Sequence, residues 1–200
     1  SGIRFADTTA NENIAIGNVV YSNGFPGGIV VEADNNSIIG NVIRSNLGNT
    51  NGIDLDGDNN YIYNNTIDAN GRDNIFIGGT GNTIKNNILS NAPGSYEGID
   101  DDGTSTTIDN NYFYTNGTGG TAHCTDSGVD CTPTNSITDS GVPGSSAGTD
   151  PGYVNTTGGN IDFLYLDSDE TASGGPLGGG VTLWPATSTL PGTINVGGRL

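Results

Sequence analysis

The stretch NSIIGNVI (residues 36–43) returns 24 positions later as NYIYNNTI (residues 60–67), and this return decides the fold. Both stretches place an asparagine two residues before an isoleucine, and an asparagine precedes a large apolar residue in the same way at five places along the chain. A regular return of this kind indicates a structural repeat of 22–26 residues. The aligned asparagines are Asn18, Asn41, Asn65, Asn87 and Asn111.

Three sets of apolar residues follow the same repeat. They are Val20/Ile43/Ile67/Leu89/Phe113, Ala15/Ile38/Ile62/Ile84/Ile108 and Ile3/Ile29/Ile53/Ile75/Ile99. One coil of this length cannot bury its apolar residues alone, but coils stacked about 4.8 Å apart bury them in continuous columns. We therefore predict about five coils built from short strands. The repeated asparagine is expected to turn the chain in left-handed backbone geometry and to pass amide hydrogen bonds to the next coil.

The motif N-x-I-x-x-N-x-I resembles that of the right-handed parallel β-helix repeat proteins, the pectate-lyase-like superfamily. The resemblance covers roughly residues 1–116 and implies an all-β, right-handed parallel β-helix. It does not imply one activity, because this fold serves lyases, hydrolases, epimerases, adhesins and fibre proteins. A partial likeness in TDPGYVNTTGGNIDFLYL (residues 149–166) to the closing segment of extracellular β-helix proteins implies secretion.

Three regions follow from the pattern. Residues 1–116 are predicted to form the regular coils, residues 117–150 an irregular loop, and residues 151–200 strands that cap or extend the helix or act as an assembly tail. Cys124 and Cys131 are the only cysteines, and a local disulfide between them is the favoured interpretation. The first residues already form a repeat-type strand, which favours end-to-end self-association or a cut from a longer parent protein.

The charge excludes several partners. With 22 acidic residues against 5 lysines and arginines, the formal net charge is −17. Such a surface repels nucleic acid and anionic membranes, and no apolar run is long enough to be inserted into a membrane. The predicted disulfide and the scarcity of lysine favour an extracellular or cell-surface location. We read the chain as a mature piece whose export signal, if it had one, has been removed.

Asp100, Asp101 and Asp102 in YEGIDDDG are the candidate catalytic carboxylates. Asp101 stands at an inward position of its strand, where an isolated carboxylate is costly. One interpretation is a paired-carboxylate hydrolytic or metal site. The other is that the regular core ends at this coil and the strand opens to solvent. The catalytic residue sets that the superfamily resemblance implies are absent from the chain.

A possible calcium site is predicted between the second and third coils. Alignment of the coils places Glu32 over Asp56 and Asp34 over Asp58, one strand spacing apart. Like charges at this distance repel unless a cation lies between them. The alternative is that all four residues are solvated turn residues of an acidic surface. Calcium is the one cofactor that this pattern suggests.

Two functions from different classes remain open. The first is a non-catalytic extracellular structural protein, a β-helix module of a surface fibre or filament that associates through its helix ends and C-terminal tail. The second is a carbohydrate-active β-helix, a polysaccharide lyase, epimerase or binding module for an acidic polysaccharide. The lack of a catalytic set favours the first, and the frequency of carbohydrate activity on this fold favours the second.

Overall fold

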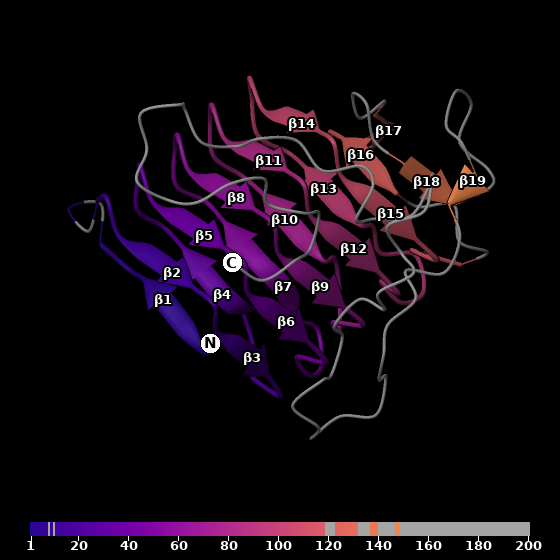
Figure 1. Ribbon diagram of the computed structural model, residues 1–200, viewed down its shortest axis with the longest axis horizontal. Helices are drawn as coiled ribbons and strands as arrows, with labels where there is room; N and C mark the ends of the chain where they lie inside the picture. Colours follow the sequence, from indigo (N-terminus) through magenta and orange to yellow (C-terminus); the bar gives the residue numbers. More distant parts are fainter. Residues whose placement is uncertain (8, 10, 119–122, 132–136, 140–146, 149–200) are drawn as a thin grey trace.

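The structure is a computed structural model that describes residues 1–7, 9, 11–118, 123–131, 137–139 and 147–148. The described residues form strands and turns, and five successive coils contribute three strands each (Figure 1). Among these residues we find no helix of the length and apolar character that a membrane span requires. The coil strands are β1 (Ile3–Phe5), β2 (Ile14–Ile16), β3 (Val19–Tyr21); β4 (Gly27–Val31), β5 (Ser37–Ile39), β6 (Val42–Arg44); β7 (Asn51–Leu55), β8 (Tyr61–Tyr63), β9 (Thr66–Asp68); β10 (Ile75–Ile77), β11 (Thr83–Lys85), β12 (Ile88–Ser90); β13 (Ile99–Asp101), β14 (Thr107–Asp109), β15 (Tyr112–Tyr114).

Corresponding strands of successive coils form three parallel sheets. Sheet A has the order β1-β4-β7-β10-β13 and continues into β16 (Cys124–Asp126) and β17 (Val129–Asp130). Sheet B has the order β14-β11-β8-β5-β2. Sheet C runs from β3 through β6, β9, β12 and β15 to β18 (Ile137–Asp139) and β19 (Ala147–Gly148). The pairing is parallel throughout except for β16 with β17.

The three predicted apolar columns are confirmed by the strand registers. Ile53 pairs with Ile75 and Ile75 with Ile99 in sheet A. The columns through Ile62 in sheet B and Ile67 in sheet C follow in the same way. These side chains make one core cluster, and most of its members are completely buried. The core therefore runs along the axis of the coils, because each coil supplies one apolar side chain to each column.

Stacked asparagines connect the coils where sheet B turns into sheet C. Asn41 donates from its backbone N–H and its side-chain amide to the Asn65 Oδ1 (2.9 and 3.0 Å), and the Asn65 amide donates to the Asn87 Oδ1 (3.0 Å). Two further asparagine stacks stand at the other corners. They are Asn13/Asn36/Asn60/Asn82 and Asn23/Asn46/Asn70.

The expected left-handed geometry lies one residue earlier than predicted. The residues with positive φ at this corner are Gly17, Gly40, Asn64, Asn86 and Asn110, each directly before a stacked asparagine. The two roles are separated for a physical reason: the left-handed residue changes the chain direction, and the next residue can then aim its amide along the stack. The prediction that one asparagine does both was wrong.

Strands also occur where the sequence predicted a loop. Residues 117–150 contain β16 to β19, and Cys124 extends an apolar column of sheet A by pairing with Ile99. Cys124 and Cys131 form the predicted disulfide, with a Cα–Cα distance of 5.3 Å. These strands escape a repeat search because their residues are polar and their coil lacks the asparagine motif. The predicted C-terminal strands and tail, residues 151–200, lie outside the described residues.

Candidate acidic site on sheet A

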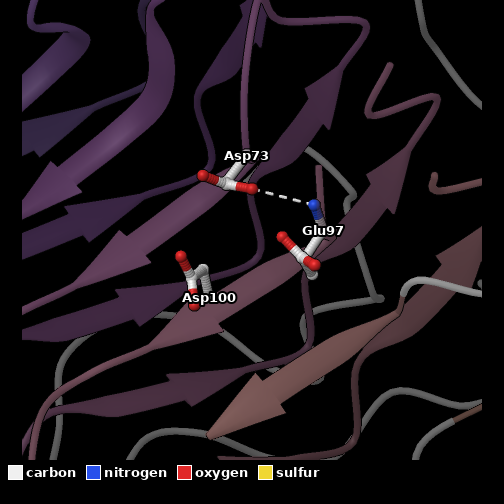
Figure 2. A group of neighbouring side chains, drawn as sticks. All are labelled: Asp73, Glu97 and Asp100. Carbon is white, nitrogen blue, oxygen red and sulfur yellow. Dashed lines mark hydrogen bonds between the residues drawn. The ribbon is translucent and has the colours of Figure 1, made fainter. Parts of the chain in front are cut away.

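Three carboxylates gather near the starts of two neighbouring strands of sheet A. Asp73 lies two residues before Ile75 of β10, Glu97 lies two residues before Ile99 of β13, and Asp100 lies within β13. Because Ile75 pairs with Ile99, Asp73 and Glu97 hold the same place in successive coils. One oxygen from each of the three carboxylates lies within 4.8 Å of the other two. Figure 2 shows the three carboxyl groups turned toward one another.

The Asp73 side chain is the most enclosed of the three. It is completely buried, and its Oδ1 accepts a hydrogen bond from the Glu97 backbone N–H (2.8 Å), drawn as the dashed line in Figure 2. Its Oδ2 faces the Arg72 Nη2 at 3.5 Å, which is too long for a good hydrogen bond. The Arg72 guanidinium in turn lies 5.2 Å from the centre of the Tyr96 ring. The positively charged Arg72 guanidinium therefore lies beside the cluster and also packs against the Tyr96 ring.

Crowding changes the protonation of the cluster. Burial, the hydrogen bond to the Asp73 carboxylate, and the negative charges of Asp73 and Asp100 raise the pKa of Glu97 to about 8. Burial also raises the pKa of Asp100, while the Thr125 hydroxyl, which donates to it at 3.0 Å, lowers it. The Glu97 carboxyl is therefore harder to ionise than that of an isolated glutamate.

Residues 51–147 match the family model for the right-handed β-helix region. The matched residues hold the acidic cluster and three of the five coils that the structure shows as a parallel solenoid. The described coils have the right-handed parallel β-helix fold. The predicted fold class is thereby confirmed. No curated protein and no solved structure matches the chain.

The side chains of the three aspartates of YEGIDDDG point in different directions. Asp100 points outward toward Thr125, Asp102 is exposed, and Asp101 occupies the inward column that Ile77 occupies in the coil before. Asp101 is buried, and its Oδ1 accepts hydrogen bonds from the Gly103 N–H (3.0 Å) and the Thr106 hydroxyl (3.1 Å). Asp100 and Asp101 thus do not face each other as a catalytic pair.

Sheet A does not end at Asp101, because β16 pairs with β13 and adds a further strand. The interpretation that the core stops and the strand opens to solvent was therefore wrong at this coil. The inward carboxylate is tolerated instead because a backbone N–H and a hydroxyl satisfy it.

The four residues of the predicted calcium site lie in adjacent coils as aligned, and three of them have partners within the protein. Asp34 Oδ1 accepts the Asp58 backbone N–H (2.8 Å), and Asp58 Oδ1 accepts the Thr80 N–H (2.7 Å). Glu32 forms an ion pair with Arg4 at 2.6 Å, and Asp56 is exposed. Backbone N–H groups therefore stabilise the Asp34 and Asp58 carboxylates. Calcium binding by these four residues stays a prediction.

Asp73 and Glu97 were missed at the sequence level, although a signal was present. Both lie two residues before the first isoleucine of their sheet A strand, in RDNIFI and YEGIDD. Extending the alignment of the isoleucine column toward the N-terminus places the two carboxylates over each other.

Asp54, in β7 on the same sheet, gives a pH-dependent prediction. Burial, Asp56 and Glu32 raise its pKa to about 6, against a hydrogen bond from Asn51 and the charge of Arg72, which lower it. The Asp54 carboxyl therefore favours the folded state below its ordinary pKa of 3.8, and this contribution is lost as the pH rises through about 6.

Replacing Asp54 with asparagine is expected to raise the free energy of unfolding by about 1 kcal/mol at pH 7.5, allowing for solvent screening. Below pH 4 the variant and the parent are expected to be equally stable. Urea unfolding at both pH values measures this, and the low-pH arm is the control. An equal gain at both values would contradict the electrostatic cause.

Proposed function

We propose that the protein is a non-catalytic structural module of an extracellular fibre or filament, in which the β-helix itself is the functional element. The proposal rests on the bonds that the charged side chains form in the described coils. Acidic side chains there accept hydrogen bonds or form ion pairs that join one coil to the next. The pairs are Asp34–Asp58, Asp58–Thr80, Asp73–Glu97, Asp68–Ser90, Asp100–Thr125, Lys85–Asp109 and Arg4–Glu32.

These bonds between coils favour a structural role for the charged residues over a catalytic one. A catalytic acid or base must come within hydrogen-bond reach of a substrate, whereas the Asp73 side chain has no exposed surface. The single histidine, His123, is buried against Phe113 rather than beside the acidic cluster. Carboxylates that bridge coils resist separation along the axis, which is the load that a fibre carries.

The first coil supports association through the helix end. Its outward-facing apolar side chains are well exposed, with Ile14 at 61%, Val19 at 50% and Tyr21 at 54%. In the third coil the same outward positions hold Tyr61 and Thr66. Contiguous exposed apolar side chains mark interaction surfaces, so we propose that this end contacts a second copy. The extracellular location rests on the disulfide and the acidic composition.

Electron microscopy of the purified chain tests the fibre proposal, with activity on uronic-acid polysaccharides measured on the same sample. Ordered end-to-end assemblies without depolymerisation are expected. Ile14→Ser combined with Val19→Ser is expected to leave a folded monomer, because these side chains face outward. Monodisperse parent protein at all concentrations, or turnover of a polysaccharide, would overturn the proposal.

Cohesion between coils is tested by replacing Asp58 with alanine. This change removes the acceptor for the Thr80 N–H while leaving the exposed turn free of steric conflict. We expect the free energy of unfolding to fall by about 1 kcal/mol, the contribution of one hydrogen bond. The matched control is Asp7→Ala, because Asp7 accepts a hydrogen bond from Thr9 within its own coil (3.0 Å). Equal losses in urea unfolding would contradict a special role for bonds between coils.

A carbohydrate-active module is the second candidate, and one observation favours it. Tyr96 and Phe76 lie partly exposed near Asp100 and the Arg72 guanidinium on sheet A. Aromatic faces beside charged groups are suited to sugar rings. Binding of a polysaccharide panel by parent and Tyr96→Ala protein tests it: binding that the substitution abolishes would favour this candidate, and no binding would rule it out for the panel.

A further inference from the structure

We propose that Asp73, Glu97 and Asp100 form a binding site for one calcium ion that joins the fourth and fifth coils. The inference goes beyond the proposed function, because it holds whether the β-helix is structural or acts on carbohydrate. The three side chains offer only oxygen atoms, the donor type that calcium and magnesium prefer. The described cysteines are joined in a disulfide, so thiolate coordination of a softer metal is not available from them.

The spacing of the oxygens fits calcium. One oxygen from each residue lies within 4.8 Å of the other two. Two oxygens that ligate the same calcium ion at 2.3–2.6 Å lie no more than about 5 Å apart. The three carboxylates are therefore close enough to share one ion.

Buried oxygens without donors are the second, independent sign of a ligand. Asp73 is 0% exposed, and within the part of the chain that the structure describes its Oδ2 has no hydrogen-bond donor. In Figure 2 the Asp73 oxygen that does not bond to Glu97 lies on the side of Asp100. Asn51 holds the same place one coil earlier, and its buried Oδ1 also has no donor among the described residues. A cation beside Asp73 would satisfy a buried acceptor that the protein itself leaves unsatisfied.

The local charge suits a divalent ion. When ionised, the three carboxylates carry three negative charges, and Arg72 contributes one positive charge at 3.5 Å from Asp73. The remaining two negative charges equal the charge of one divalent cation. Packing of Arg72 against Tyr96 leaves the guanidinium to one side of the cluster, since its carbon lies 5.2 Å from the ring centre.

Isothermal titration of the full chain with calcium chloride tests the site. One saturable site per chain is expected, with weaker binding of magnesium. Asp73→Asn and Glu97→Gln are expected to weaken calcium binding by at least about tenfold. Asp109→Asn is the matched control, because it removes one negative charge from the same protein at the Lys85 ion pair, away from the site. Its calcium affinity is expected to stay within about twofold of the parent.

Several results would overturn the proposal. They are non-saturating binding, tighter binding of magnesium than of calcium, or an equal loss in the Asp109 variant, which would mean binding to the general acidic surface. An equal loss in Asp56→Asn would place the ion between the second and third coils instead. Asparagine is tolerated at this place, as Asn51 shows one coil earlier, and Glu97→Gln decides the outcome if Asp73→Asn does not fold. Fibre formation is measured separately, so the two proposals fail independently.

Discussion

Replacing Gly79 with alanine is expected to lower the free energy of unfolding by at least about 3 kcal/mol, because the new methyl group would overlap the backbone of the coil before. A Cβ at Gly79 would lie 2.1 Å from the Gly57 carbonyl oxygen and 2.8 Å from that of Asp56. Both partners are backbone atoms, so no side chain can rotate away. The coils would have to separate by about 1 Å at this corner, which weakens the parallel hydrogen bonds around it.

Gly24→Ala is the matched control for this prediction. A Cβ at Gly24 meets no atom within 4 Å, and its φ is not in the left-handed region. Its stability in urea is expected to stay within about 0.5 kcal/mol of the parent. If the Gly79→Ala variant were as stable as the Gly24→Ala variant, the predicted steric overlap between the coils at Gly79 would be contradicted.

Replacing Asn65 with alanine is expected to destabilise the protein by about 4 kcal/mol, because one side chain there serves three coils. The Asn65 amide donates to the Ile38 carbonyl (2.9 Å) and to the Asn87 Oδ1 (3.0 Å). Its own Oδ1 accepts both the backbone N–H and the side-chain amide of Asn41. Asn65 is completely buried, so water cannot replace the lost partners.

Asn18 provides the comparison within the same stack. Its amide donates to the Asn41 Oδ1 (3.0 Å) and the Ile16 carbonyl (3.2 Å), and it lies in the first coil, where it is partly exposed. Asn18→Ala is expected to cost about 1 kcal/mol or less, because the Asn41 Oδ1 keeps its hydrogen bond from the Asn18 backbone N–H (2.9 Å). Circular dichroism during urea unfolding measures both variants. An equal loss of unfolding free energy in the two variants would contradict the larger role expected for the buried Asn65.

The columns and the order of strands could be predicted because a solenoid repeats its contacts at a fixed separation in the sequence. Ile53, Ile75 and Ile99 were aligned from spacing alone, and their registers are as aligned. The coil that contains Cys124 was not predicted, since its strands lack the repeated motif. Where the repeated motif is missing, the spacing of residues no longer predicts which side chains face inward.

The candidate site was predicted only in part. Asp100 was named as a candidate from the DDD run, but its partners Asp73 and Glu97 were not. The run suggested neighbours in sequence, whereas residues 100 and 101 of one strand point to opposite faces of the sheet. The residues that do meet are 24 positions apart, which is one turn of the helix.

By itself, the sequence determined the length of each coil, the three apolar columns and the asparagine stacks, because these follow from a period that is visible in the residues. Only the tertiary structure decided which charges face one another and what satisfies them. Asp34 and Asp58 found backbone N–H partners, while the fully buried Asp73 was left with one oxygen that has no donor in the described coils. Such outcomes depend on side-chain direction and burial to within an ångström, which the repeat period does not specify.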